Sequence, residues 1–231
     1  MPGLLQQCIE LSRPVLRLIP LPLKIAIKKA IRYNINTQNY WDAIWEEEGE
    51  DTWRDYTNKY PFIIQQIPDT GRLIDIGCGV GKLLQKLRDA KPALKLTGTD
   101  ISPVAVELLQ KQGFEGLVAA FPEIPLPDSA FDIVLATEVL EHLSKPEEAV
   151  AEVVRLMTPE GCAVLTVPDD CLGPEDEVQH LWKFNRDSYQ ALLAPYFNEI
   201  TMTSIPDLDH KFLVAVCHKP NKSKSKPKNL A

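Results

Sequence analysis

The feature that most constrains the fold is an apolar run that ends in three alternating glycines, Leu73–Gly81. A second apolar run, Leu94–Thr99, follows it and ends in Asp100. Such a sequence is typical of two parallel strands joined by a glycine turn and a helix, with a nucleoside-type cofactor at the carboxyl ends of the strands. We therefore expect a cofactor site built from the glycine turn and the carboxylate that ends the second run.

From Arg72 onward, strand-like and helix-like segments alternate. The expected strands are Arg72–Ile76, Leu94–Asp100, Leu117–Ala119, Phe131–Ala136, Gly161–Val167, Glu199–Ser204 and Phe212–Cys217. The expected helices are Gly81–Asp89, a helix with Ser102 as N-cap and Pro103 at its first position, Pro146–Met157 and Asn185–Leu193. This alternation predicts an α/β fold, a mostly parallel sheet with helices on both faces.

Charge is distributed unevenly along the 231 residues, whose net charge is −7. Residues 1–36 hold six basic residues and one acid, and residues 219–231 hold five lysines and no acid. The part between them has 14 basic and 31 acidic residues, a net charge of −17. Such an acidic body is a poor surface for nucleic acid. The pattern divides the chain into an N-terminal helical segment over 1–60, a cofactor-binding domain over 61–218 and a disordered Lys-rich tail over 219–231.

The five cysteines show no spacing typical of a metal site, which favours free thiols in a reducing compartment. The apolar stretch Val15–Leu23 is interrupted by Arg17, Pro20 and Pro22 and is shorter than the ~20 residues that span a bilayer. No signal peptide is evident, so we expect a cytoplasmic protein.

The spacing of the glycines separates two cofactor classes. A dinucleotide-binding turn has the pattern Gly-x-Gly-x-x-Gly, which would place the third glycine at Lys82 rather than at Gly81. The Gly-Lys-Ser/Thr signature of a phosphate-binding loop is missing at the required offset as well. The turn therefore argues against a dehydrogenase.

Four motifs occur in order along the chain: Asp75-x-Gly77-x-Gly79-x-Gly81, then Asp100, then Pro125–Asp132, then Glu138–Leu143. Together they resemble the class I S-adenosylmethionine-dependent methyltransferases, of the type that acts on small molecules, over about Tyr40 to His218. The resemblance implies a Rossmann-like, doubly wound sheet of seven strands with an N-terminal helical cap. It also implies S-adenosylmethionine as the cofactor.

The resemblance assigns roles to the residues around the turn. Gly77, Gly79 and Gly81 let backbone N–H groups approach the methionine end of the cofactor, where a Cβ would collide, and Cys78 lies within the same cofactor-binding turn. Asp75 would organise water and the α-amino group, and Asp100 would accept both ribose hydroxyls. The remaining contacts implied are Ile101 on the adenine, Ala120 and Phe121 at its edge, the carbonyl of Thr137, and Arg54 toward the methionine carboxylate. Many relatives carry an acid at the position of Ala120, so the adenine contact must come from backbone or water here.

Glu138, Glu141 and His142 follow the fourth expected strand, where the acceptor should face the cofactor. If this stretch is helical, all three side chains lie on one face. They could then bind a divalent cation such as Mg²⁺, and a metal-dependent subset of the family, which includes RNA 3′-end 2′-O-methyltransferases, is similar in this pattern. Metal-free relatives carry the Glu-His pair too, where it caps the helix and packs under the cofactor.

His180 is open to three interpretations: a general base, a further metal ligand, or a hydrogen-bonded wall residue. The candidate catalytic residues are therefore Glu138, His142 and His180. The chemistry required of them is modest, since methyl transfer depends mainly on holding a nucleophile about 3 Å from the methyl carbon.

The N-terminal segment has an imperfect amphipathic pattern, with apolar residues from Leu23 to Ile31 on one helical face and basic residues largely opposite. It would either cap the cofactor or make a peripheral membrane contact. We expect methyl transfer to a small-molecule acceptor, at oxygen. The alternatives are a metal-assisted RNA 2′-O-methyltransferase and a protein that binds S-adenosylmethionine without catalysis.

Overall fold

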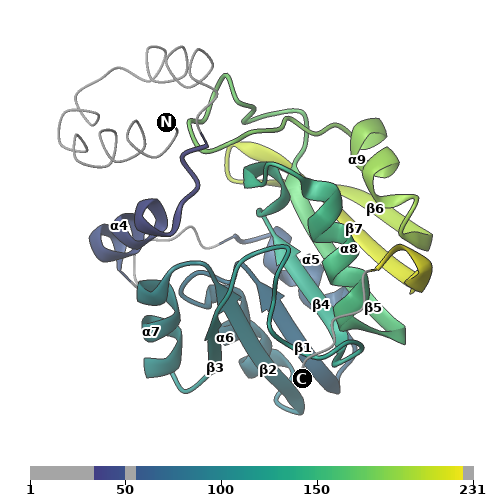
Figure 1. Cartoon of the computed structure of the whole chain (residues 1–231), viewed down its shortest axis with the longest axis horizontal. Helices are drawn as coiled ribbons and strands as arrows, with labels where there is room; N and C mark the ends of the chain where they lie inside the picture. The colour runs from purple at the N-terminus through teal and green to yellow at the C-terminus, as the bar shows by residue number, and fades with distance from the viewer. Residues whose placement is uncertain (1–33, 50–55, 226–231) are drawn as a thin grey trace.

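The computed structural model describes residues 34–49 and 56–225, which contain one seven-stranded sheet. The strands lie in the order β3-β2-β1-β4-β5-β7-β6 (Figure 1). Their bounds are β1 Gly71–Ile76, β2 Leu94–Asp100, β3 Glu115–Val118, β4 Phe131–Thr137, β5 Met157–Pro168, β6 Phe197–Asp207 and β7 His210–Pro220. β1 to β5 are parallel, and β7 is antiparallel to both β5 and β6. The predicted mostly parallel, doubly wound sheet is confirmed.

Helices cover both faces of the sheet (Figure 1). One core contains side chains of α5 (Lys59–Gln66), α6 (Lys82–Ala90) and α7 (Pro103–Lys111), and the other those of α8 (Pro146–Leu156) and α9 (Arg186–Leu193). The helix α4 (Gln38–Glu48) lies beside α7. Two short 3₁₀ helices, η1 (Leu140–His142) and η2 (Lys222–Lys224), complete the elements.

Side chains of each central strand alternate between the two cores, as in a sheet buried on both faces. In β1, Leu73 packs on the side of α5 and α6, whereas Ile74 packs on the side of α8. In β4, Ile133 and Val134 repeat this alternation. Such strands read as continuous apolar runs, which is why the sequence reveals them.

The predicted helix starts and the first two strands agree closely with the structure, whereas three later strands differ. β5, β6 and β7 are each longer than expected, because their pairing continues through polar residues at the ends of the strands. The disordered tail expected from Lys219 is also wrong for residues 219–225, which are ordered parts of the structure. β7 extends to Pro220, and Lys222 Nζ donates a hydrogen bond to the carbonyl of Val154 at 2.7 Å.

The remaining expectations concern the N-terminal segment, membrane-spanning helices and the cysteines. The basic segment before residue 34 and Arg54 lie outside the described residues. Within the described ranges, no helix combines the length and the apolar composition needed to cross a membrane, and Cys78, Cys162, Cys171 and Cys217 are free thiols.

A buried arginine ties α8 to the loop before β4. Arg155 is 1% exposed and donates to Glu152, to Asp128 and to the carbonyls of Ile124 and Leu126 at 2.7–3.0 Å. Glu152 in turn accepts a hydrogen bond from the backbone N–H of Ile124. One guanidinium thus donates hydrogen bonds to two carboxylates and two backbone carbonyls.

Arg155→Met is expected to lower the free energy of unfolding by about 3–5 kcal/mol, because it leaves Glu152 as an uncompensated buried charge. Urea denaturation monitored by circular dichroism measures the change. Arg72→Met is the matched control: Arg72 pairs with Asp132 at the surface, and its loss should cost about 0–1 kcal/mol. Equal effects of the two substitutions would contradict the role given to the network.

Candidate functional site

A cavity of about 840 Å³ lies at the carboxyl ends of the parallel strands. The ends of β1, β2 and β4 contribute Gly77, Asp100 and Thr137 to its wall. Because the carboxyl ends of parallel strands meet at one edge, residues distant in sequence share this wall. The cavity is the size of a typical small-molecule site.

The glycine turn forms one side of the cavity. Gly77 and Gly79 have φ angles of 72° and 53°, in the left-handed region that favours glycine. A Cβ on Gly77 would lie 2.5 Å from Val139, and one on Gly79 would lie 2.5 Å from the ring of Trp45. The turn therefore combines an unusual backbone conformation with close neighbours, and only glycine satisfies both.

Asp100 is buried and bonded to the turn. Its Oδ2 accepts a hydrogen bond from Gly79 N, and its Oδ1 accepts one from Ser102 N, both at 2.9 Å. Burial raises the pKa of Asp100 to about 6, although the two backbone N–H groups act in the opposite direction. Both carboxylate oxygens keep further lone pairs, so Asp100 can accept the two hydrogen bonds expected from the ribose hydroxyls.

Asp75 lies behind this wall rather than on it. It is 1% exposed, it does not line the cavity, and its Oδ1 has no hydrogen-bond partner. Burial, and secondarily the charge of Asp100, raises the pKa of Asp75 to about 7. A buried carboxylate oxygen without a donor fits a site that a ligand amine or an ordered water completes.

Most other residues expected around the cofactor are brought together. Cys78, Ile101, Ala120, Phe121 and Thr137 all line the cavity. Gly81 does not line it and acts instead as the N-cap of α6, with φ 80° and Leu109 only 2.4 Å from where a Cβ would lie. The glycine cradle, the carboxylate of Asp100 and the unpartnered oxygen of Asp75 together fit S-adenosylmethionine.

The helix α4 contributes Tyr40, Trp41, Ile44 and Trp45 to the cavity wall. Trp45 packs on Gly79, and Asp42 accepts a hydrogen bond from the Ser102 hydroxyl. Just before α4, Asn36 Nδ2 donates to the carbonyls of His142 at 3.0 Å and Gln179 at 2.7 Å. The described part of the N-terminal segment is thus bonded to both ends of the cavity.

Glu138 occupies a different position from the one expected. It has a φ of 57°, and its backbone N–H still donates to Thr166 O at 3.1 Å, so it continues the β4–β5 pairing. Only Leu140–His142 form a helical turn, η1. The expected single helical face with Glu138, Glu141 and His142 is therefore wrong.

The Glu138 carboxylate is fixed by two other side chains. The hydroxyl of Thr166 donates to Oε1 at 2.6 Å, and Lys59 Nζ lies 3.4 Å from the same oxygen. Lys59 is fully buried, with Nζ 3.5 Å from the ring centroid of Tyr56 and 3.8 Å from that of Phe212. Burial lowers the pKa of Lys59, against the neighbouring Glu138 charge.

Sequence reasoning missed Lys59. It precedes β1 in a polar stretch without a motif, and nothing local distinguishes it from a surface lysine. Its position is set by Asp207, whose Oδ2 accepts hydrogen bonds from the backbone N–H groups of Asn58 and Lys59 at 2.7 Å. That contact joins segments about 150 residues apart, so no spacing rule could reveal it.

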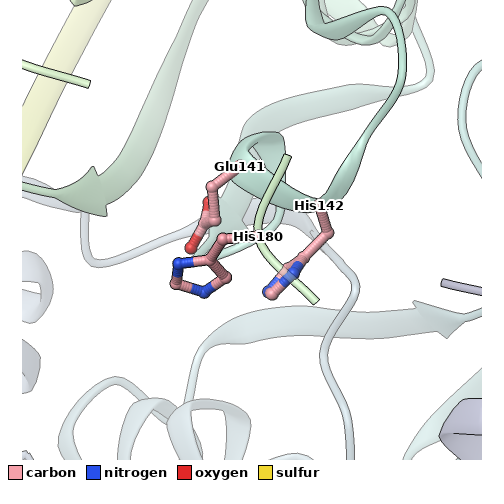
Figure 2. Close-up of side chains that lie close together, drawn as sticks. All are labelled: Glu141, His142 and His180. Carbon is pink, nitrogen blue, oxygen red and sulfur yellow. The ribbon is translucent and has the colours of Figure 1, made fainter. Parts of the chain in front are cut away.

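Glu141, His142 and His180 meet at the cavity wall (Figure 2), and the ring centroid of Trp41 in α4 lies 5.2 Å from that of His142. One ligand atom of each lies within 4.8 Å of the others. Burial, and secondarily Glu138, raises the pKa of Glu141 well above its ordinary value. The structure thus brings His180 to the Glu-His pair and leaves Glu138 apart from it.

Comparison with known proteins agrees with this site. Residues 74–165 match the family described as a methyltransferase domain. A tRNA (carboxymethyluridine(34)-5-O)-methyltransferase of Arabidopsis thaliana is 30% identical over 47% of this chain and 27% of its own length. Ajmaline N-methyltransferase of Rauvolfia serpentina is 29% identical over 54% of this chain and 49% of its own. The chain therefore spans half or less of these two curated relatives.

A solved structure shares the fold. The 1,6-didemethyltoxoflavin-N1-methyltransferase of Burkholderia thailandensis, with bound 1,6-didemethyltoxoflavin and S-adenosylhomocysteine, has a TM-score of 0.61 and 18% identity. The match covers 77% of this chain and 85% of that one.

Replacing Asp75 should change how stability depends on pH. Because the folded pKa of about 7 lies above the unfolded value, the folded protein holds the extra proton between about pH 4 and 7, and its stability falls as the pH rises through that window. Asp75→Asn removes this loss. The stability difference between Asp75→Asn and the wild type is expected to grow by about 2–3 kcal/mol from pH 5 to pH 8.

Urea denaturation of cofactor-free protein at the two pH values measures this difference. Asp209→Asn, at an exposed turn position, is the control and should show no pH-dependent difference. A difference for Asp75→Asn that stays constant or shrinks toward pH 8 would refute the assignment.

Proposed function

We propose that this chain, which belongs to the class I S-adenosylmethionine-dependent methyltransferases, methylates a small-molecule acceptor at oxygen. S-adenosylmethionine would supply a methyl group on a sulfonium: the acceptor oxygen would bond to the methyl carbon in line as the carbon–sulfur bond breaks, S-adenosylhomocysteine would leave as a neutral thioether, and the hydroxyl proton would pass to a base in the cavity. The residues that support the proposal lie in one cavity: the cofactor residues at the glycine turn, and Glu138, His142 and His180 at the other end.

The observation that carries the proposal is the continuity of this cavity from Asp100 to Glu138. Residues at the turn would hold the cofactor, since Gly77 and Gly79 let the backbone approach it and Asp100 would accept its ribose hydroxyls. Cys78, Ile101, Ala120, Phe121 and Thr137 would line the adenosyl part. Asp75 would act from behind the wall, through water or the α-amino group.

Glu138 is the candidate general base for an acceptor hydroxyl. Thr166 and Lys59 fix its Oε1, so that the carboxylate is held at the cavity wall. A fixed carboxylate near the acceptor could take the proton that a hydroxyl loses as it is methylated. His142 and His180 would bound the acceptor on the opposite side.

The charge of the wall favours a small acceptor over RNA. Among the described lining residues, Lys59 and Lys145 are basic, whereas the acids are Asp100, Glu138, Glu141, Glu148 and Glu177. An RNA substrate is held mainly through its phosphates, which need a basic rim. Aromatic side chains at the wall suit a planar or apolar acceptor instead: Tyr40, Trp41, Tyr56, Tyr60 and Phe212.

Asp100→Asn is expected to weaken binding of S-adenosylhomocysteine at least about tenfold, because an amide cannot accept two hydroxyl hydrogen bonds as a carboxylate does. Isothermal titration calorimetry at pH 8 measures the affinity. Asp209→Asn should bind as the wild type does. If the wild-type chain gave no heat with S-adenosylhomocysteine, the proposed function itself would fall.

Glu138→Gln should reduce the turnover number by about 10²–10⁴-fold, the range of general-base catalysis, and leave the affinity for S-adenosylhomocysteine unchanged. Transfer of a labelled methyl group into a panel of phenols, carboxylic acids, amines and tRNA, resolved by mass spectrometry, identifies the acceptor and gives the rate. If Glu138→Gln turned over at the wild-type rate, Glu138 would not be the general base. Cofactor binding without transfer to any acceptor would support a binding protein instead.

A further inference from the structure

We propose that Glu141, His142 and His180 bind a divalent transition-metal ion of the zinc class at the acceptor end of the cavity. The three side chains come from η1 and from the loop before α9, and they converge in space (Figure 2). The inference goes beyond methyl transfer, because the protein alone, without cofactor or acceptor, must show the metal binding.

The strongest observation is that Glu141 is buried without hydrogen bonds to its side-chain oxygens. Its side chain is 1% exposed, and neither Oε1 nor Oε2 has a hydrogen-bond partner. Burying a carboxylate without donors is costly, and such groups are normally paired or coordinate a metal. Two imidazole rings whose centroids lie 4.8 Å apart are beside it. The Lys59 ammonium acts on this carboxylate through its charge but makes no hydrogen bond to it, so a metal ion between the carboxylate and the rings would supply the missing partner.

A second observation is the orientation of the two histidine rings. His142 Nδ1 lies 3.2 Å from the carbonyl oxygen of Gln179, and His180 Nδ1 contacts the carbonyl oxygen of Leu172. A carbonyl can only accept, so each Nδ1 carries the proton, and the lone pair of the neutral ring is on Nε2. Backbone carbonyls orient metal-binding histidines in the same way in known sites.

The backbone around the group is already fixed. Leu181 N donates to Glu141 O at 2.7 Å, and Trp182 Nε1 donates to Leu143 O at 2.7 Å. Asn36 bridges the carbonyls of His142 and Gln179. These hydrogen bonds hold the two segments in register, so the backbone already brings the three side chains together.

The distances set how far the group must close to bind an ion. Ligand atoms at about 2.0–2.1 Å from a tetrahedral zinc ion lie about 3.3 Å from one another. The present upper limit of 4.8 Å is longer, so the three side chains must move closer together to bind an ion. One carboxylate and two imidazoles suit zinc and similar metals, whereas Mg²⁺ prefers oxygen ligands and retains water. A fourth position would remain open to the cavity.

Glu138 is excluded from this set by its own contacts. Thr166 and Lys59 occupy its Oε1, and Glu138 does not belong to the group of converging ligand atoms. The proposed ligands therefore differ from the Glu138, Glu141 and His142 expected from the sequence, and so does the metal.

The test uses the purified full chain, stripped with EDTA and dialysed. We expect isothermal titration calorimetry to give one Zn²⁺ bound per chain and no binding of Mg²⁺ at the same concentrations. His142→Ala, His180→Ala and the isosteric Glu141→Gln should each weaken Zn²⁺ binding at least tenfold. His218→Ala, which removes an exposed histidine of β7, should leave it unchanged, and circular dichroism confirms the fold of each variant.

A measurement on the unmodified chain covers the case in which a variant does not fold. In ¹⁵N NMR, two of the four histidines should shift at Nε2 on addition of Zn²⁺. No zinc binding, equal loss in His218→Ala, or a strong thiolate band with Co²⁺ would each overturn the proposal, the last by assigning the ion to cysteines. Since binding of S-adenosylhomocysteine is measured separately, either proposal can fail without the other.

Discussion

The attachment of the glycine turn to the end of β2 determines the geometry of the whole cavity. Gly77 N and Cys78 N donate to Thr99 O at 2.7 and 3.0 Å, and Gly79 N donates to Asp100. Three successive amides of one strand's turn are thus bonded to the neighbouring strand. This attachment sets where α6 begins, where Trp45 packs on Gly79 and where the buried carboxylates lie.

The cofactor half of the site could be predicted from the sequence because its determinants are local. Apolar runs mark β1 and β2, the glycines mark a turn with positive φ, and Ser102-Pro103 marks the start of α7, where the Ser102 hydroxyl accepts from Ala105 N. The parallel register then places the ends of β1 and β2 together without further information. Asp75 was expected at the same edge, but its exact depth depends on packing that no pattern reveals.

The acceptor half depends on contacts between distant segments, and there the predictions were incomplete. A helix over Glu138–His142 would have placed three candidate ligands on one face, whereas pairing of Glu138 with Thr166 extends β4 and delays the helical turn. Lys59 reaches Glu138 only because Asp207, in β6, caps the start of α5. His180 reaches Glu141 through hydrogen bonds between two loops. Sequence spacing carries no signal for contacts of this kind.

Asn36 and α4 connect the two halves. Within one short stretch, Asn36 donates hydrogen bonds to the carbonyls of His142 and Gln179, and Trp45 packs on Gly79. Any movement of this stretch would break its contacts with the turn and with the loops of His142 and His180 at the same time. In a methyltransferase of the kind proposed, access to the cofactor end and access to the acceptor end of the cavity would then change together.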